Sequence, residues 1–196
     1  MTMSIMRFDM RSPDLGASET SAQYAGALEM AAWADQKGVD MVVLSEHHGA
    51  DDGYLPSPMV MAAAVAAVTK RISINISALL VPLHNPVRLA EDVAVVDLIS
   101  GGRISFVAGM GYRKVEYDAL GVPWAGRGKR MDDALEVLLK AWRGEEFEWE
   151  GGTYRVTPLP LQQPPMVFVG GSGPKAAKLA ARFGLGLFPS TDDQEL

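Results

Sequence analysis

Short apolar runs alternate along this chain with longer segments in which apolar residues recur at helical spacing. The clearest run is Met41–Leu44, which Val39 precedes, and its lack of polar positions is typical of a parallel strand buried on both faces. The segments predicted as strands are Ser4–Met10, Val39–Leu44, Ile72–Val81, Arg103–Ala108, Met166–Val169 and Leu185–Phe188.

The segments between these strands have the periodicity and the end signals of helices. The first helix is expected to begin with Thr20 or Ser21 as its N-cap and to run to Lys37. A small hairpin is expected over Phe147–Val156. The other predicted helices are Met59–Thr69, Val87–Ser100, Lys114–Leu120, Lys129–Arg143 and Lys175–Phe183.

This alternation of strands and helices predicts an α/β fold with a parallel sheet. A doubly wound sheet and a (β/α)8 barrel both fit the order of the elements. No G-x-G-x-x-G follows the first strand, which gives little support to a dinucleotide-binding Rossmann domain. With 196 residues, the chain is expected to form one domain.

Composition narrows the classes of function. The net charge of −6 and the absence of a basic run argue against a nucleic-acid surface. Cysteine is absent and only three histidines occur, so a zinc site is not expected. The N-terminal residues lack the apolar core of a signal peptide, and the longest apolar run, Met59–Val68, is too short to span a membrane. We therefore expect a cytoplasmic protein.

Four polar residues, Ser45, Glu46, His47 and His48, directly follow the second predicted strand. The carboxyl ends of parallel strands are where α/β folds bind ligands. A carboxylate and two imidazoles at such an end are suited to moving protons. The same cluster is equally compatible with hydrogen bonds that serve only the fold.

Two glycine-rich turns follow later strands. Gly109–Tyr112 allows the backbone to approach a flat ligand, with Tyr112 to stack on it, although a tight turn with a core tyrosine is the simpler alternative. Gly170–Gly173 precedes a predicted helix, where backbone N–H groups bind anions. A phosphate-bearing ligand and a plain flexible loop fit this second turn equally well.

Other catalytic patterns are not supported. Gly170–Pro174 is not the nucleophile elbow G-x-S-x-G, because Pro174 replaces the last glycine and no histidine follows. A glycosidase pair of Glu46 with Asp51 or Asp52 is disfavoured, since only Glu46 lies at a strand end. Arg127 and Arg130 are expected on the solvated face of a helix start, and a catalytic clamp of these residues is disfavoured.

Taken together, these residues resemble the flavin-dependent luciferase-like monooxygenases. The second strand of that family ends in E-H-H, as Glu46–His48 does here. The most specific similarity is Pro82–Asp92, P-x-x-x-P-V-R-L-A-E-D, followed by Leu98–Arg103, L-I-S-G-G-R. The further matches, in family order, are Gly109–Tyr112, Glu116–Tyr117, Gly121–Pro123, Arg127–Gly128 and Gly170–Ser172.

The resemblance implies a (β/α)8 barrel that binds reduced FMN, or in some branches the deazaflavin F420, at the carboxyl ends of the strands. An FMN enzyme of this kind oxidises a small-molecule substrate with O2 and takes its reduced flavin from a separate reductase. His47 matches the family's catalytic histidine near the flavin C4a position, while His48 is expected to point away. The positions that match cofactor-binding residues are Glu46, Ser77 and Ala78 with a cis peptide bond between them, Met110, Gly111, Tyr112, Gly170, Gly171, Ser172 and Gly173.

The chain differs from the family pattern in length, since about six βα units are expected where the full barrel has eight. An incomplete barrel leaves two strand edges and an apolar interior uncovered, so we expect a homo-oligomer. A shortened flavin-binding protein without catalytic activity is the alternative. The residues expected to be exposed at the open edges are Met6, Phe8, Leu185, Leu187 and Phe188.

Overall fold

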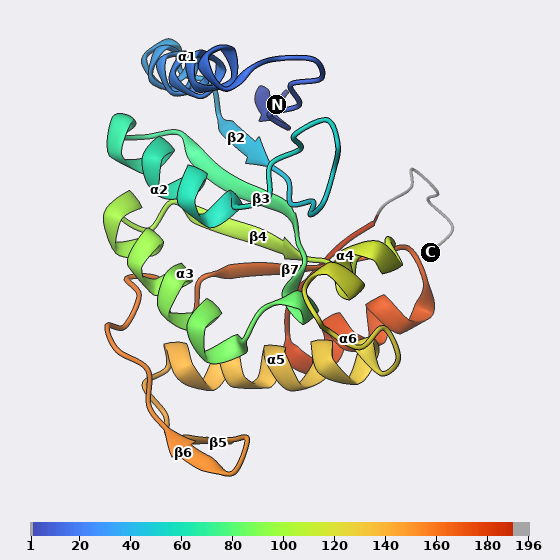
Figure 1. Ribbon diagram of the computed structural model, residues 1–196. Coiled ribbons are helices and arrows are strands. Elements are labelled where there is room, and N and C mark those ends of the chain that lie inside the picture. The colour runs from blue at the N-terminus through green and yellow to red at the C-terminus, as the bar shows by residue number, and fades with distance from the viewer. Residues whose placement is uncertain (1, 190–196) are drawn as a thin grey trace.

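The computed structural model describes residues 2–189 and contains a sheet of six parallel strands (Figure 1). Strands of this sheet that follow one another along the chain lie side by side. Two further strands form a separate hairpin, which comes along the chain between the fourth and fifth strands of the sheet. The strands, in order across the sheet, are β1 (Ile5–Phe8), β2 (Met41–Leu44), β3 (Ser73–Leu79), β4 (Ile104–Ala108), β7 (Met166–Gly170) and β8 (Gly186–Phe188).

The helices follow one another around one side of the sheet, whereas a short helix, α4, lies near the carboxyl ends of the strands (Figure 1). The predicted hairpin is present as β5 (Phe147–Trp149) and β6 (Gly152–Tyr154), and it projects away from the sheet. The helices are α1 (Ala17–Lys37), α2 (Pro58–Val68), α3 (Pro86–Ser100), α4 (Lys114–Ala119), α5 (Arg127–Trp142) and α6 (Pro174–Phe183), and η1 (Val81–Leu83) is a 3-10 turn.

The strand order decides between the two architectures that the sequence left open. A doubly wound sheet reverses its strand order at a switch point, whereas here the order rises from β1 to β8 without reversal. Consecutive parallel pairing of this kind is the arrangement of a (β/α)8 barrel. Within the described residues β1 and β8 are edge strands, so the barrel is incomplete, as predicted.

The two faces of the sheet differ in chemistry. Val42, Ile74 and Ile104 are partners across three strands and are almost fully buried on the face that the helices cover. Asn75 and Ser105 lie on the opposite, inner face, where the Asn75 amide donates to Ser105 Oγ at 2.8 Å. Because side chains alternate along a strand, the main core lies between the sheet and the helices, and part of the inner face is polar.

Several predicted element boundaries differ from the structure by one to four residues, and two of these differences have a clear cause. The first helix begins at Ala17, and its N-cap is Gly16, which has no side chain to accept a capping hydrogen bond. Thr20 N already donates to Gly16 O at 2.9 Å, so the helical hydrogen bonds begin one turn before the predicted Thr20 or Ser21 cap. The third strand ends at Leu79, and Val81–Leu83 forms η1 instead of continuing it.

The expected exposure of the edge residues was correct for Leu187 and Phe188, which are 38% and 48% exposed. It was wrong for Phe8, which is only 9% exposed. Phe8 is the partner of Leu44 in the parallel register, so both side chains point to the helix-covered face. The two remaining residues, which are half-buried, are Met6 and Leu185.

A buried carboxylate lies beside the segment that enters β3. Asp35, in α1, accepts hydrogen bonds from the backbone N–H groups of Lys70, Arg71 and Ile72 at 3.0, 2.8 and 2.7 Å. Burial acts to raise the pKa of Asp35, but these three hydrogen bonds lower it overall. This contact fixes α1 to the segment that enters β3, at the end of the sheet opposite the polar cluster.

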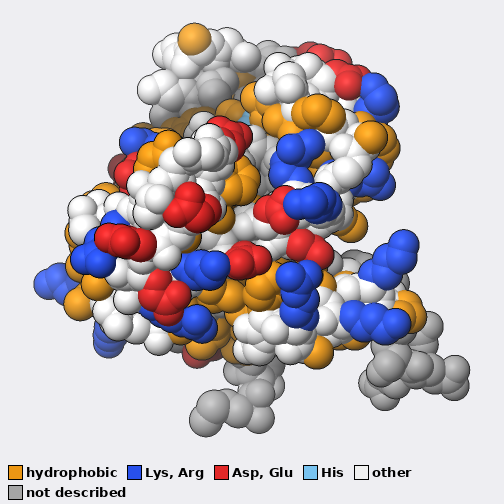
Figure 2. Space-filling model, turned by 90° about the horizontal axis from the view of Figure 1, so that it is seen from below, with side chains coloured by type: hydrophobic (Ala, Val, Ile, Leu, Met, Phe, Trp, Pro, Cys, Tyr) orange, Lys and Arg blue, Asp and Glu red, His pale blue; other side chains and the backbone are white. Residues whose placement is uncertain are grey.

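The outer surface carries mixed charges. Figure 2 shows Asp and Glu side chains interspersed with Lys and Arg on the face seen from below. Pairs on α5 such as Lys129–Asp133 and Lys140–Glu136 contribute to this pattern, which is typical of a solvent-exposed helix face. No helix among residues 2–189 is long and apolar enough to cross a membrane.

Candidate active site

The polar residues that follow β2 lie at the carboxyl edge of the sheet, beyond the last strand residue, Leu44. Ser45 is 3% exposed. Its hydroxyl accepts a hydrogen bond from Arg7 at 2.7 Å and donates to Ser77 O at 3.0 Å. This chain of contacts ties the ends of three neighbouring strands together and fixes the backbone at Ser77.

Glu46 is a buried carboxylate that joins two loops. Its Oε1 accepts hydrogen bonds from His48 Nε2 at 2.9 Å and His84 Nε2 at 2.8 Å, and its Oε2 accepts one from Leu80 N at 2.6 Å. Burial acts to raise the pKa of Glu46, but the hydrogen bonds from His48 and His84 lower it to about 2. The hydrogen bond to Glu46 raises the pKa of His48. Glu46 is therefore ionised near neutral pH and fastens the loop after β3 to the loop after β2.

A second buried carboxylate, Glu116 of α4, holds the other histidine. Glu116 is 0% exposed, and its Oε1 accepts hydrogen bonds from His47 Nδ1 at 2.8 Å, His48 N at 3.2 Å and Arg113 at 3.2 Å. Its Oε2 is buried and has no hydrogen-bond partner within the part of the chain that the structure describes. The His47 ring is thus anchored by a carboxylate that reaches it from another loop.

His47 lines a hollow of about 350 Å³, which we call the His47 hollow. Two tyrosine rings meet the imidazole edge to face, Tyr54 at 4.4 Å and Tyr112 at 5.8 Å between ring centroids. The Arg11 guanidinium lies 4.6 Å over the Tyr54 ring. The other residues that line the His47 hollow are Ala50, Asp51, Asp52 and Arg113.

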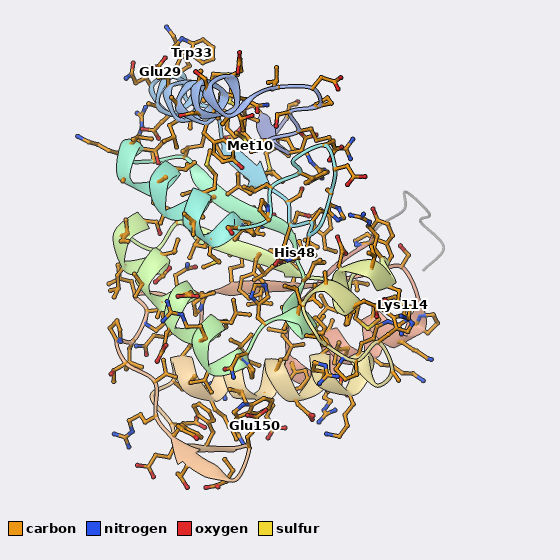
Figure 3. All side chains as sticks on the ribbon, in the orientation of Figure 1. Met10, Glu29, Trp33, His48, Lys114 and Glu150 are labelled. Atoms are coloured by element: carbon orange, nitrogen blue, oxygen red, sulfur yellow. The ribbon has the colours of Figure 1, made fainter. Side chains whose placement is uncertain are left out.

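The neighbouring histidines diverge, as expected, although for a different reason. Both follow the end of β2, so alternation along a strand does not apply to them. Instead each ring binds a different carboxylate, His47 that of Glu116 and His48 that of Glu46. Figure 3 shows His48 inside the molecule, near the strand ends, and of the two rings it is His47 that lines the hollow.

A second hollow, of about 410 Å³, lies where β4 and β7 end beside α5 and α6, and we call it the Gly170 hollow. Its lining includes Gly170 from the predicted turn and Lys175 from the first turn of α6. Met110 lines the Gly170 hollow and Tyr112 lines the His47 hollow. The Gly109–Tyr112 turn therefore lies between the two hollows.

The predicted flavin-lining segments lie against one another. The peptide bond between Ser77 and Ala78 is cis, as predicted. A Cβ atom on Gly109 would lie 2.7 Å from the Ala78 Cβ, so this position of the turn requires glycine. Tyr112 is 79% exposed, which excludes the alternative of a core tyrosine.

The Gly170–Gly173 turn is also shaped by its glycines. A Cβ atom on Gly170 would lie 2.9 Å from Val107 Cγ1, and Gly171 has a φ of +136°. Gly173 is the N-cap residue of α6 and supplies no side-chain cap. The turn thus delivers the chain directly to a helix N-terminus, as the sequence predicted.

The sequence did not single out several residues of the site. Glu116 was noted only as part of the resemblance, and nothing local distinguishes it from the exposed Asp118 on the same helix. Its burial becomes visible only when α4 packs over the strand ends. The other residues that were not predicted for the site are Tyr54, His84 and Arg113. Among residues 2–189 no group of three or more His, Cys, Asp or Glu could hold a metal ion.

Comparison with known proteins agrees with this fold. The family model described as luciferase-like monooxygenase matches residues 1–195, so the chain belongs to this family. Its relatives include the oxygenase component of the flavin-dependent trigonelline monooxygenase of Acinetobacter baylyi, which is 27% identical over 169 residues. That alignment covers 82% of this chain and 47% of the relative.

Two solved structures illustrate the similarity of this fold to known proteins. The oxygenating constituent of 3,6-diketocamphane monooxygenase from Pseudomonas putida, in complex with FMN, has a TM-score of 0.80 and is 22% identical, covering 95% of this chain and 57% of that one. The F420-dependent tetrahydromethanopterin reductase of Methanopyrus kandleri has a TM-score of 0.67 and is 21% identical, covering 91% and 52%. At these identities the likeness concerns the fold.

The chain spans about half the length of the curated relatives it matches, with 48%, 52% and 47% of three of them covered. The family model shows membership of the luciferase-like monooxygenase family, and the chain's own activity is a matter of proposal. Its own cofactor, substrate and partners are matters of proposal.

Proposed function

We propose that this chain binds reduced FMN and supports the oxidation of a small organic substrate by O2. The observation that carries the proposal is the position of His47. Its ring is anchored by the buried Glu116 and faces a hollow walled by Tyr54 and Tyr112. The adjoining Gly109–Tyr112 turn packs its backbone against Ala78, which supports a flat ring system beside His47.

The Gly170 hollow suits the phosphate end of such a cofactor. The helix α6 begins there without a side-chain cap, and a helix N-terminus favours an anion. The basic side chains of Lys175, Lys178 and Arg182 line the same hollow. Because the Gly109–Tyr112 turn borders both hollows, one extended ligand that crosses this turn would have its phosphate near Gly170 and its ring near His47.

The cofactor and the residues of the site would have separate roles in the reaction. A bound reduced flavin supplies the electrons that activate O2. His47 exchanges a proton with the substrate, a task that requires a titratable ring within hydrogen-bond reach of it. Tyr54 and Tyr112 flank that ring and would form the walls against which the substrate lies.

Two partners belong to the same proposal. A relative of this chain is named as the oxygenase component of its monooxygenase, which supports a separate reductase as the source of reduced flavin. The open edges β1 and β8 support self-association of the chain. We infer a homo-oligomer that receives its reduced flavin by diffusion.

A titration of the chain with FMN, reduced FMN, riboflavin and F420 tests the cofactor, followed by stopped-flow measurement of reduced FMN oxidation. We expect binding of reduced FMN that is weaker for riboflavin, because riboflavin lacks the phosphate. Lys175→Ala should weaken FMN binding and leave riboflavin binding unchanged. The matched control is Lys114→Ala, because Lys114 forms an exposed ion pair with Asp118 and lines neither hollow.

Other outcomes would reassign the protein. Tight binding of F420 with no binding of FMN would place the protein in the F420-dependent branch, which transfers hydride. An F420-dependent reductase is among the structures that resemble this chain. Binding of FMN without faster oxidation of the reduced form would indicate a flavin-binding protein without catalysis. Binding of none of the four ligands would refute the proposal.

A further inference from the structure

Three donors converge on one oxygen of Glu116. The Arg113 guanidinium and the His48 backbone N–H can only donate, so Glu116 Oε1 is the acceptor for both. His47 Nδ1 lies 2.8 Å from the same oxygen. A carboxylate oxygen offers lone pairs only, so Nδ1 of His47 donates to Oε1 as the other two groups do.

This contact determines the other nitrogen of the ring. A neutral imidazole has one N–H group and one lone pair, and the hydrogen bond made by one nitrogen fixes the state of the other. Among residues 2–189, no group forms a hydrogen bond with His47 Nε2, and the ring lines the His47 hollow. We propose that Glu116 is the positioning residue that fixes His47 in the Nδ1–H form, which leaves the Nε2 lone pair to accept a proton from the substrate.

The other two histidines show the opposite arrangement. Glu46 Oε1 accepts from Nε2 of both His48 and His84, and its Oε2 accepts from Leu80 N. In these two rings Nε2 therefore carries the hydrogen. The two buried carboxylates thus fix the three imidazoles of the chain in two different tautomers. His47 carries its hydrogen on Nδ1 and has Nε2 available, whereas His48 and His84 carry theirs on Nε2.

The position of Glu116 is itself fixed by its neighbour in α4. Tyr117 is 0% exposed, its hydroxyl donates to Met110 O, and its ring meets Trp124 edge to face at 5.0 Å. Because Met110 belongs to the turn between the two hollows, α4 and that turn form one packed unit. The carboxylate therefore holds the His47 ring from a rigid support, as an orienting group requires.

The test uses long-range proton–nitrogen NMR correlations of the imidazole rings, at a pH at which the rings are neutral. The spectrum of the full chain without flavin contains the signals of three histidines, and His47→Gln assigns those of His47. Glu116→Gln keeps a carbonyl oxygen for the three donors but removes the charge, and Glu116→Ala removes the acceptor. Asp118→Asn is the matched control, since it removes a carboxylate charge from the exposed side of α4.

In the wild-type chain and in Asp118→Asn, we expect the hydrogen of His47 on Nδ1. In Glu116→Gln the Nε2–H form should become populated, because a neutral amide is a weaker acceptor than a carboxylate. In Glu116→Ala the Nε2–H form should predominate, while His48 and His84 keep their forms. Turnover of the loaded enzyme should fall by roughly a hundredfold in Glu116→Ala with its flavin affinity retained.

A wild-type His47 with its hydrogen on Nε2 would overturn the inference, and so would an unchanged His47 signal in folded Glu116→Ala. The catalytic part of the inference depends on the proposed function, but the NMR readout does not need flavin. If the ring signals change as expected and His47→Ala retains full turnover, the proposed role of His47 fails and the positioning by Glu116 stands.

Discussion

At the scale of single residues, the site depends on two carboxylates that are almost fully buried. Glu46 and Glu116 are 1% and 0% exposed, and each binds imidazole nitrogen. Removing one partner of such a contact leaves the other buried without compensation, which costs more than the net worth of the contact. Substitutions at these contacts therefore affect function and stability to different degrees, and the predictions below separate these effects.

His47→Ala is expected to lower turnover roughly a hundredfold or more while flavin affinity stays near that of the wild type. The reason is that the proposed seat for the flavin ring is made by the Gly109–Tyr112 turn and Ala78, and the imidazole is not part of it. Steady-state kinetics and flavin titration measure the two quantities. His48→Ala is the control, and an equal loss of turnover in that variant would contradict the assignment of His47.

The second prediction concerns acid stability. The pKa of Glu46 is lowered from 4.5 to about 2, so its contribution to stability is complete above pH 4.5 and is lost as the pH falls towards 2. The contribution is roughly 3 kcal/mol, since one pKa unit corresponds to about 1.4 kcal/mol. Urea unfolding from pH 2 to 5 should show a steeper loss of stability for the wild type than for Glu46→Gln.

The hydrogen bond between Glu46 and His48 also gives a pH dependence of stability with the opposite sign at higher pH. The pKa of His48 is raised above 6.5 by its hydrogen bond to Glu46, so this contribution is complete below pH 6.5 and is lost as the pH rises through the raised value. His48→Gln should abolish this decrease in stability with rising pH. Parallel pH profiles of the wild type and both variants would contradict the Glu46–His48 contact.

At the scale of elements, the ends of the sheet have different tasks. The carboxyl ends carry the polar cluster, whereas the amino ends carry contacts such as Asp35 with the segment before β3. This division is the one that barrel folds use, with function at one face and stability at the other. Changes at Asp35 should therefore leave the site intact.

Asp35→Ala is expected to lower the free energy of unfolding by about 3 kcal/mol, because three backbone N–H groups lose a charged acceptor. Denaturant titration measures this change. The control is Asp118→Ala, whose exposed carboxylate pairs with Lys114 and should cost less than about 0.5 kcal/mol. Flavin affinity of the folded Asp35→Ala protein should match that of the wild type, and similar stability losses in the two variants would contradict the role of Asp35.

At the scale of the whole molecule, the arc of six strands leaves its inner face partly open. Ile5 and Met166 are each 56% exposed and Phe188 is 48% exposed, and the register places all three on that face. Open strand edges and exposed apolar side chains both favour association with another chain. The described residues thus supply a physical reason for the predicted homo-oligomer.

Light scattering at micromolar concentration should show a dimer or larger assembly. Phe188→Lys should shift the chain towards the monomer, because a charged group on the inner face opposes burial. Leu161→Lys is the control, since Leu161 is 61% exposed but lies in the loop before β7, outside both edge strands. A wild-type chain that stays monomeric and unfolds cooperatively at this concentration would contradict the prediction.

Much of the architecture followed from local pattern. The apolar runs of β2 and β4 identified buried strands, and glycine at positions 109 and 170 marked turns where a side chain would collide with a neighbour. The cluster Glu46–His48 was singled out as a candidate site because it directly follows a strand. Such features could be predicted because periodicity and turn chemistry depend on residues that are close in sequence.

The sequence by itself determined the order of strands and helices and the end of the sheet at which ligands would bind. Only the tertiary structure decided which carboxylate holds which histidine, since His47 and Glu116 are 69 positions apart and His84 and Glu46 are 38 apart. It also decided that Phe8 is covered, because the register with Leu44 turns it towards the helices. The physical reason is that periodicity fixes what each element buries, whereas contacts between loops form only when the parallel strands bring their carboxyl ends to one edge.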